Sequence, residues 1–159
     1  GTDLTLRSEN NSSADGDGAI QVEDGDFLPN IPKHSFKVRA EYKPTTSWYL
    51  GATMTAFSSS YMMGNENQEN DSSANGLQSE VPGYAIINLD GEYNFSNMLE
   101  GWKLYAKVTN LFDNKYYTGG RIAESRVAAD RSFSDDEIAT ASLVGGSPRA
   151  GWVGLRYEF

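Results

Sequence analysis

The chain has 159 residues, a formal net charge of −9 and no cysteine. This length suffices for one domain with a core, and the absence of thiols excludes disulfides and thiolate chemistry. No run of about 18 apolar residues occurs, which excludes a transmembrane helix, and the acidic balance argues against a nucleic-acid partner.

The first half of the chain alternates between extended segments and polar connections. Residues 2–7 end a partial strand, and residues 8–32 form a loop rich in acids, Asn, Ser and Gly. Apolar residues then recur at every second position over 33–43, which is the pattern of a strand with two unlike faces. A tight turn at 44–47 leads into a second such strand over 48–61.

The second half repeats this alternation. A polar loop over 62–82 precedes a strand over 83–95, and a short connection leads to another strand over 102–112. Residues 113–148 form the longest connection, and the closing strand over 149–159 ends on an aromatic residue. Strict alternation divides this last strand into two unlike rows. The apolar row holds Val153, Leu155, Tyr157 and Phe159, and the other row holds both charges, Arg156 and Glu158.

Two regularities favour an outer-membrane β-barrel over a soluble sheet. The predicted strands have about 10–14 residues, close to the roughly 9–11 that cross a bilayer and longer than the roughly 5–6 of globular strands. The connections are alternately long and short, so the chain is predicted to be an all-β, antiparallel up-and-down meander with its long loops at one end. We therefore expect extracellular loops at 8–32, 62–82 and 113–148, and a periplasmic carboxy-terminus.

The two faces of the strands predict two surroundings. A charge on the lipid face costs about 2–4 kcal/mol near the midplane, so the charged rows should face the barrel lumen. The expected lumen-facing residues are Lys37, Arg39, Glu41, Asn88, Asp90, Glu92, Lys103, Lys107 and Arg156. Aromatic residues near the periplasmic strand ends should form a girdle at the membrane interface. They are Tyr42, Trp48, Tyr93, Trp102, Tyr157 and Phe159.

Two motifs narrow the class of barrel. An NLFDxxY sequence ends the strand before the longest connection, and a GxPR sequence leads into the closing strand, which ends YEF. Together they resemble the carboxy-terminal end of TonB-dependent outer-membrane receptors, over roughly residues 28–159. The matching residues are Asn110, Leu111, Phe112, Asp113, Tyr116, Gly146, Pro148, Arg149, Tyr157 and Phe159, supported by the segments 31–36 and 82–84.

The resemblance implies a transmembrane barrel of about 22 strands with a plugged lumen. It implies import of a scarce ligand across the outer membrane of a Gram-negative bacterium, driven by an inner-membrane energy-coupling complex. Such ligands are typically ferric siderophores, haem, cobalamin or oligosaccharides, and we expect a ferric siderophore or similar iron chelate. It also implies that the outer-membrane assembly machinery reads Leu155, Tyr157 and Phe159.

Residues 1–159 would then be the carboxy-terminal barrel segment, without a plug domain. The segment offers about six strands, fewer than the roughly eight of the smallest ordinary barrel, so it would be the last part of a receptor. The partners implied are the rest of the barrel and its plug, outer-membrane lipid and a small-molecule ligand.

Candidate ligand-binding residues lie at the start of the longest connection. Arg121, Arg126 and Arg131 follow one another at five-residue spacing, just after Tyr116 and Tyr117. Guanidinium groups suit a carboxylate- or catecholate-bearing chelate, and aromatic rings suit its flat faces. The alternative is that these arginines neutralise nearby acids of the same loop.

The remaining signals are structural or weak. His34 is interpreted as a surface or interface residue, because no cysteine or second histidine can complete a zinc site. The acidic runs at 15–18 and 23–26 lack the EF-hand spacing and predict solvated loop, with loose divalent-cation binding as the alternative. Ser134 to Glu137 has the form of a capping box and predicts a short helix. We expect no metal site, no cofactor and no enzymatic activity.

Two alternatives stay open from the sequence. A soluble β-sandwich or carbohydrate-binding module would mix long and short connections at both ends of its sheets. A passive porin fragment would share the aromatic carboxy-terminus, but the NLFDxxY segment disfavours it.

Overall fold

The computed structural model describes residues 4–7, 19–23, 25–68, 79–95, 99–127 and 132–159. Within these ranges it contains eleven β-strands and no helix that is long and apolar enough to cross a membrane. The chain divides into two compact units. The sheet unit comprises 34–57, 84–116 and 146–159, and the loop unit comprises 1–33, 58–83 and 117–145.

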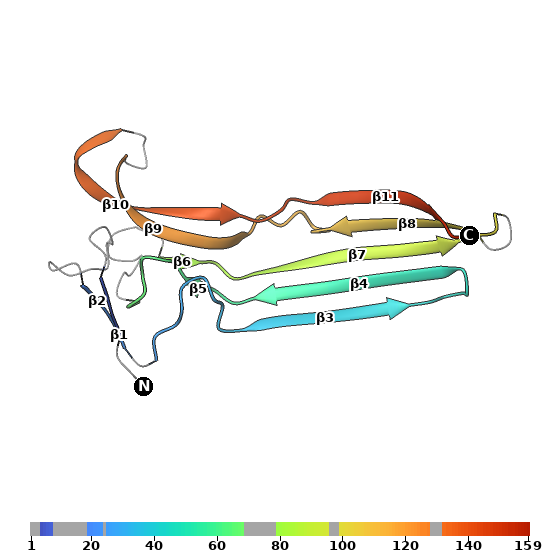
Figure 1. The fold of residues 1–159 in the computed structure, drawn as a ribbon, viewed down its shortest axis with the longest axis horizontal. Coiled ribbons are helices and arrows are strands. Elements are labelled where there is room, and N and C mark those ends of the chain that lie inside the picture. Colours follow the sequence, from blue (N-terminus) through green and yellow to red (C-terminus); the bar gives the residue numbers. More distant parts are fainter. Residues whose placement is uncertain (1–3, 8–18, 24, 69–78, 96–98, 128–131) are drawn as a thin grey trace. The chain divides into compact units, whose positions relative to one another are not determined.

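Five antiparallel strands make up the sheet of the sheet unit (Figure 1). Their bounds are β3 Ser35–Tyr42, β4 Trp48–Phe57, β7 Tyr84–Asn94, β8 Trp102–Thr109 and β11 Ala150–Tyr157. Their order across the sheet is β11-β8-β7-β4-β3, so the strands follow one another as a meander. All five lie inside the segments that alternation predicted, and the predicted all-β antiparallel fold is confirmed.

The register aligns apolar residues with apolar residues across the whole sheet. One row pairs Tyr42 with Leu50, Leu50 with Gly91, Gly91 with Ala106, and Ala106 with Val153. Because directly opposed residues share a face, this row and its neighbours make one face of the sheet apolar. The face is uncovered, with Val153 73% exposed. Water disfavours an apolar surface of this kind, whereas lipid suits it.

Aromatic rings gather at the end of the sheet that carries the short turns. The ring centroids of Trp48 and Tyr93 lie 4.7 Å apart, and those of Trp102 and Tyr157 lie 5.2 Å apart. Tyr157 meets Phe159 edge to face at 5.0 Å. The carboxy-terminus lies at the same end as the β3–β4 turn (Figure 1). Five of the residues predicted to form a girdle are therefore neighbours along one edge.

The loop unit contains three antiparallel strand pairs. β1 Leu4–Arg7 pairs with β2 Ala19–Val22, β5 Ser60–Tyr61 pairs with β6 Glu80–Val81, and β9 Tyr117–Val127 pairs with β10 Phe133–Gly145. A small core of Met62, Val81 and Ile122 joins the β5–β6 and β9–β10 pairs. Met62 packs directly over Gly120, where an added Cβ would lie 2.9 Å from its Cγ.

The structure differs from the sequence-based expectations at several places. The predicted strand over 48–61 ends at Phe57, and Ser60–Tyr61 forms β5 in the loop unit instead of extending β4. The helix predicted at 134–137 is wrong, because this segment is extended within β10, at the register irregularity between the Phe133 and Ile138 pairs with β9. The connection 113–148 contains β9 and β10 and is largely a hairpin. Of the partial strand predicted at 2–7, the described residues 4–7 pair with β2 in the loop unit instead of extending the five-stranded sheet.

Candidate functional site

Arg39 on β3 organises the polar face of the sheet. Its Nη1 and Nη2 donate to Oδ1 and Oδ2 of Asp90, each at 2.8 Å, so this ion pair is bidentate. Nη1 also donates to Thr53 Oγ1 at 2.8 Å, Nε donates to Glu41 Oε1 at 2.8 Å, and Nη2 donates to the hydroxyl of Tyr49. One guanidinium thus links β3, β4 and β7, which its planar fork allows and a Lys ammonium would not.

The Arg39–Asp90 pair crosses β4 over Gly51. An added Cβ at Gly51 would lie 2.6 Å from Asp90 Oδ2 and would also meet Arg39 Nη2. A glycine inside a strand marks this kind of close approach. The sequence analysis missed Gly51. In the register it lies between Glu41 on β3 and Asp90 on β7, and Arg39 reaches across it from two residues along β3.

The other residues predicted to face the lumen lie on the same polar face. The ladder pairs Lys37 with Thr55 and Glu92 with Tyr49. Asn88 Oδ1 accepts a hydrogen bond from the backbone N–H of Asn110 at 2.9 Å. The sheet therefore carries Lys37, Arg39, Glu41, Asn88, Asp90, Glu92, Lys103, Lys107 and Arg156 together on one side.

A charge cluster lies at the short-turn end of the polar face. Lys103 Nζ lies 2.8 Å from Glu158 Oε2, and Arg156 Nη1 lies 3.9 Å from Glu158 Oε1. Glu158 follows the last residue of β11. The hydrogen bond from Lys103, reinforced by its positive charge, holds the pKa of the Glu158 carboxyl below its usual range.

The NLFDxxY motif forms a hydrogen-bonded corner after β8. Asn110 is 2% exposed and has a φ of 49°, which ends the strand earlier than alternation predicted. Its Nδ2 donates to Asn114 O at 2.9 Å and to Ser147 O at 3.1 Å, and its Oδ1 accepts from Asn114 N at 3.0 Å. Asp113 has a φ of 55°, and its Oδ1 accepts from Arg149 N at 2.9 Å. Asn and Asp tolerate this left-handed backbone better than other residues. Through the hydrogen bonds to Ser147 and Arg149, the NLFDxxY motif contacts the GxPR motif.

Tyr116, a predicted ligand contact, is part of this corner. Its ring centroid lies 4.5 Å from that of Tyr84. The same ring covers Gly146, where an added Cβ would lie 2.5 Å from Tyr116 Cδ2, and Gly146 N donates to Tyr116 O at 2.8 Å. Its packing gives Tyr116 a structural role in the sheet unit.

The other predicted ligand contacts belong to the loop unit. Tyr117, Arg121 and Arg126 lie on β9 and are exposed. Side chains an odd number of positions apart along a strand leave opposite faces, so Arg121 and Arg126 do not converge. Arg131 lies outside the described residues. The register shift between Tyr117 and Gly119 also puts Tyr117 and Arg121 on opposite faces of the β9–β10 pair, so the structure does not bring the predicted ligand contacts together.

The residues predicted as an assembly signal lie at the edge strand of the sheet. Leu155 is paired with Leu104 and Tyr157 with Trp102, both on the apolar face. Phe159 follows β11 with its side chain fully exposed. An exposed aromatic end beside an open strand edge is accessible to another protein.

The acidic run at 23–26 has a structural explanation. Asp26 Oδ2 accepts from Glu23 N at 2.8 Å, and Asp26 Oδ1 accepts from Gln68 Nε2 at 2.7 Å. The run at 15–18 lies outside the described residues, and His34 is exposed. In the described part of the chain, no group of three His, Cys, Asp or Glu side chains could hold a metal ion.

Residues 2–111 match the family of TonB-dependent receptor-like β-barrels. The chain belongs to this family. TonB-dependent receptors are outer-membrane proteins, and they are transporters rather than enzymes. The resemblance drawn from the sequence motifs is confirmed, as is the predicted outer-membrane location.

Three solved structures share the fold. The siderophore receptor PiuA from Acinetobacter baumannii has a TM-score of 0.55 and 17% identity, over 81% of this chain and 14% of that one. The ferric-catecholate import receptor Fiu from E. coli K12, in its open form, has a TM-score of 0.52 and 18% identity, over 80% and 16%. The copper transporter OprC has a TM-score of 0.50 and 20% identity, over 83% and 18%. The chain thus spans under a fifth of each of these proteins, and its strands match a segment of the 22-strand receptor barrel.

Proposed function

We propose that this chain is the carboxy-terminal part of a receptor that actively imports a ferric siderophore or a similar iron chelate. The observation that carries the proposal is the two-faced meander, with an uncovered apolar face and a hydrogen-bonded polar face. Family membership argues against the soluble β-sandwich or carbohydrate-binding alternative. PiuA is a siderophore receptor and Fiu a ferric-catecholate receptor, which supports an iron chelate as the ligand.

In this proposal the apolar face contacts lipid and the face that carries Arg39 and Asp90 lines the lumen. The short turns, the aromatic edge and Phe159 are periplasmic, because transmembrane barrels have short periplasmic turns and longer extracellular loops. The rings then lie at the periplasmic membrane interface, which suits amphipathic side chains. The long connections 8–32, 62–82 and 113–148 are extracellular, and Tyr117 and Arg121 on β9 are the first candidates to meet ligand. The plug, the missing strands and the inner-membrane energy-coupling complex are the partners of the whole receptor, and Leu155, Tyr157 and Phe159 guide its assembly.

The proposal is tested by uptake in cells that produce the full-length receptor. Deletion of its gene should abolish energy-dependent uptake of radioactive iron supplied as one of several chelates, such as catecholates, hydroxamates or citrate. Arg121→Ala should weaken uptake several-fold, while the matched control Arg126→Ala, which alters the opposite face of β9, should not.

Two results would contradict the proposal. Uptake that persists when the inner membrane is de-energised would indicate the passive porin alternative. If deletion of the gene lowers copper uptake and leaves iron uptake unchanged, the ligand is copper, as for the copper transporter OprC.

A further inference from the structure

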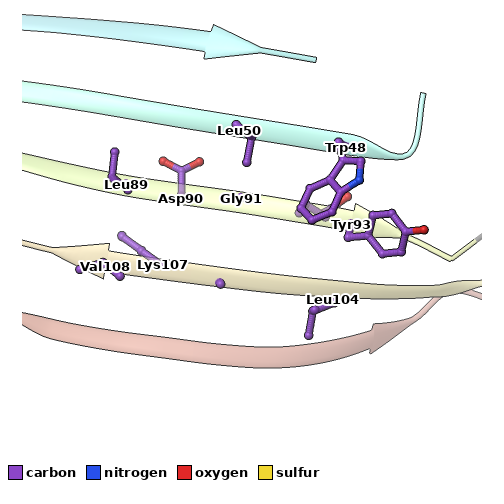
Figure 2. A pocket seen from close by; sticks show the side chains of 11 residues that line it. Trp48, Leu50, Leu89, Asp90, Gly91, Tyr93, Leu104, Lys107 and Val108 are labelled. Atoms are coloured by element: carbon purple, nitrogen blue, oxygen red, sulfur yellow. The ribbon is translucent and has the colours of Figure 1, made fainter. Parts of the chain in front are cut away.

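A shallow depression of about 220 Å³ lies on the apolar face of the sheet unit, over β4, β7 and β8 (Figure 2). Its side-chain walls include Leu50, Leu89, Leu104 and Val108. Figure 2 shows the rings of Trp48 and Tyr93 together at one end of it, the end nearest the β3–β4 turn.

The depression exists because two small residues are adjacent in the register. Gly91 is paired with Ala106, and this pair offers almost no side-chain volume. The flanking rows are larger: Leu89 opposes Val108 on one side, and Tyr93 opposes Leu104 on the other. Leu50 leans over the floor, since its Cδ2 would lie 3.2 Å from a Cβ added at Gly91.

The lining is apolar in character even though three charged residues border it. Asp90, Glu92 and Lys107 contribute their backbone here, because alternation sends their side chains to the polar face. Asp90, for instance, binds Arg39 on that opposite face at 2.8 Å. The depression therefore offers hydrocarbon contact and no charge.

We infer that this depression is a seat for one acyl chain of a phospholipid in the periplasmic leaflet of the outer membrane. The inference rests on the proposed orientation, in which the apolar face contacts lipid and the short turns are periplasmic. The depression is continuous with that lipid-contacting face. The polar tips of Trp48 and Tyr93 suit the headgroup level, while their rings lie against the chain below it.

The test uses the full-length receptor in native outer membranes, with a phosphatidylethanolamine that carries a photoreactive diazirine in one acyl chain. Cross-linked peptides are quantified by mass spectrometry. We expect labelling of the peptides that contain Leu50 and Leu104 to exceed, several-fold, labelling of the same face around Val38, which does not line the depression.

A filling substitution and a matched control sharpen the test. Ala106→Leu fills the floor of the depression and should lower labelling there several-fold. Ala40→Leu makes the same change at an exposed position of the same apolar face outside the depression and should leave the labelling unchanged. Neither substitution touches the polar face, so uptake of iron should persist in both variants.

Each other outcome has a distinct meaning. Uniform labelling of the face, or labelling that does not change in Ala106→Leu, would refute the acyl-chain seat, while the proposal that the face contacts lipid would still hold. Absence of labelling anywhere on the face overturns the proposed orientation together with the seat. Stronger labelling of the depression by a lipid A that carries the same diazirine overturns the choice of leaflet. Labelling of the depression only after the receptor is separated from other membrane proteins overturns the choice of lipid as its occupant.

Discussion

The corner formed by Asn110 provides a quantitative test of the structure. Asn110→Ala removes three side-chain hydrogen bonds to backbone groups of Asn114 and Ser147 in a site that is 2% exposed. At about 1 kcal/mol for each bond, plus about 1 kcal/mol for alanine in left-handed backbone, the loss is about 4 kcal/mol of unfolding free energy.

Asn110→Gly separates the two contributions. Glycine loses the same hydrogen bonds but adopts the φ of 49° freely, so it should cost about 3 kcal/mol, or about 1 kcal/mol less than alanine. Asn114→Ala is a milder comparison, since its side chain makes an exposed hydrogen bond to Ala85 O at 3.0 Å; it should cost about 1 kcal/mol or less.

The assay is urea unfolding of the full-length receptor in detergent micelles, followed by the fraction of folded protein on unheated gels. The expected order of stability is wild type, Asn114→Ala, Asn110→Gly and Asn110→Ala. A loss below about 1 kcal/mol for Asn110→Ala, or a glycine variant less stable than the alanine variant, would refute the role assigned to the side chain and its backbone.

Three further outcomes are expected. Gly51→Ala should destabilise the sheet of the wild type, because the added Cβ meets both Arg39 and Asp90, but should cost less in a background that carries Arg39→Ala and Asp90→Ala, where both contacts are absent. Equal effects in the two backgrounds, seen by urea unfolding, would contradict this. Lys103 lowers the pKa of Glu158, so their ion pair stabilises the fold at pH values above the ordinary carboxylate pKa, and this contribution disappears as the pH falls through the lowered pKa. Lys103→Met should remove that part of the acid sensitivity, measured as heat stability against pH. Gly120→Val should displace the methionine that packs over it and speed proteolysis of the loop unit, while unfolding of the sheet is unchanged.

The alternation of apolar and polar residues predicted the five strands of the sheet and which charged residues share a face. Such alternation can be read from a short stretch of sequence, because a strand with one apolar face needs an apolar residue at every second position. It placed Arg39 and Asp90 on one face correctly. It did not predict that they touch, because contact depends on the register of three strands and on the missing side chain at Gly51.

The errors have the same origin in long-range pairing. The segment 117–145 is rich in Gly, Ser and acids, which favours loop in any local window, yet it pairs as β9 and β10. The capping-box pattern at 134–137 is likewise a local signal, yet the segment is extended within β10. The motif at Asn110 was recognised only through its resemblance to a known family. Its left-handed backbone and hydrogen bonds could not be predicted, because they produce no periodic pattern of apolar and polar residues.

The contacts that close this corner have a consequence for how such receptors diversify. Gly146 N and Tyr116 O are 2.8 Å apart, and Asn110 Nδ2 reaches Ser147 O at 3.1 Å, so both ends of the segment 117–145 are anchored in the sheet unit. Because both ends of the segment are fixed, the entropic cost of closing a longer segment between them grows only slowly with its length. Evolution can therefore exchange or lengthen this segment while the strands of the sheet unit keep their register. The same anchors make it a natural cassette for grafting between receptors.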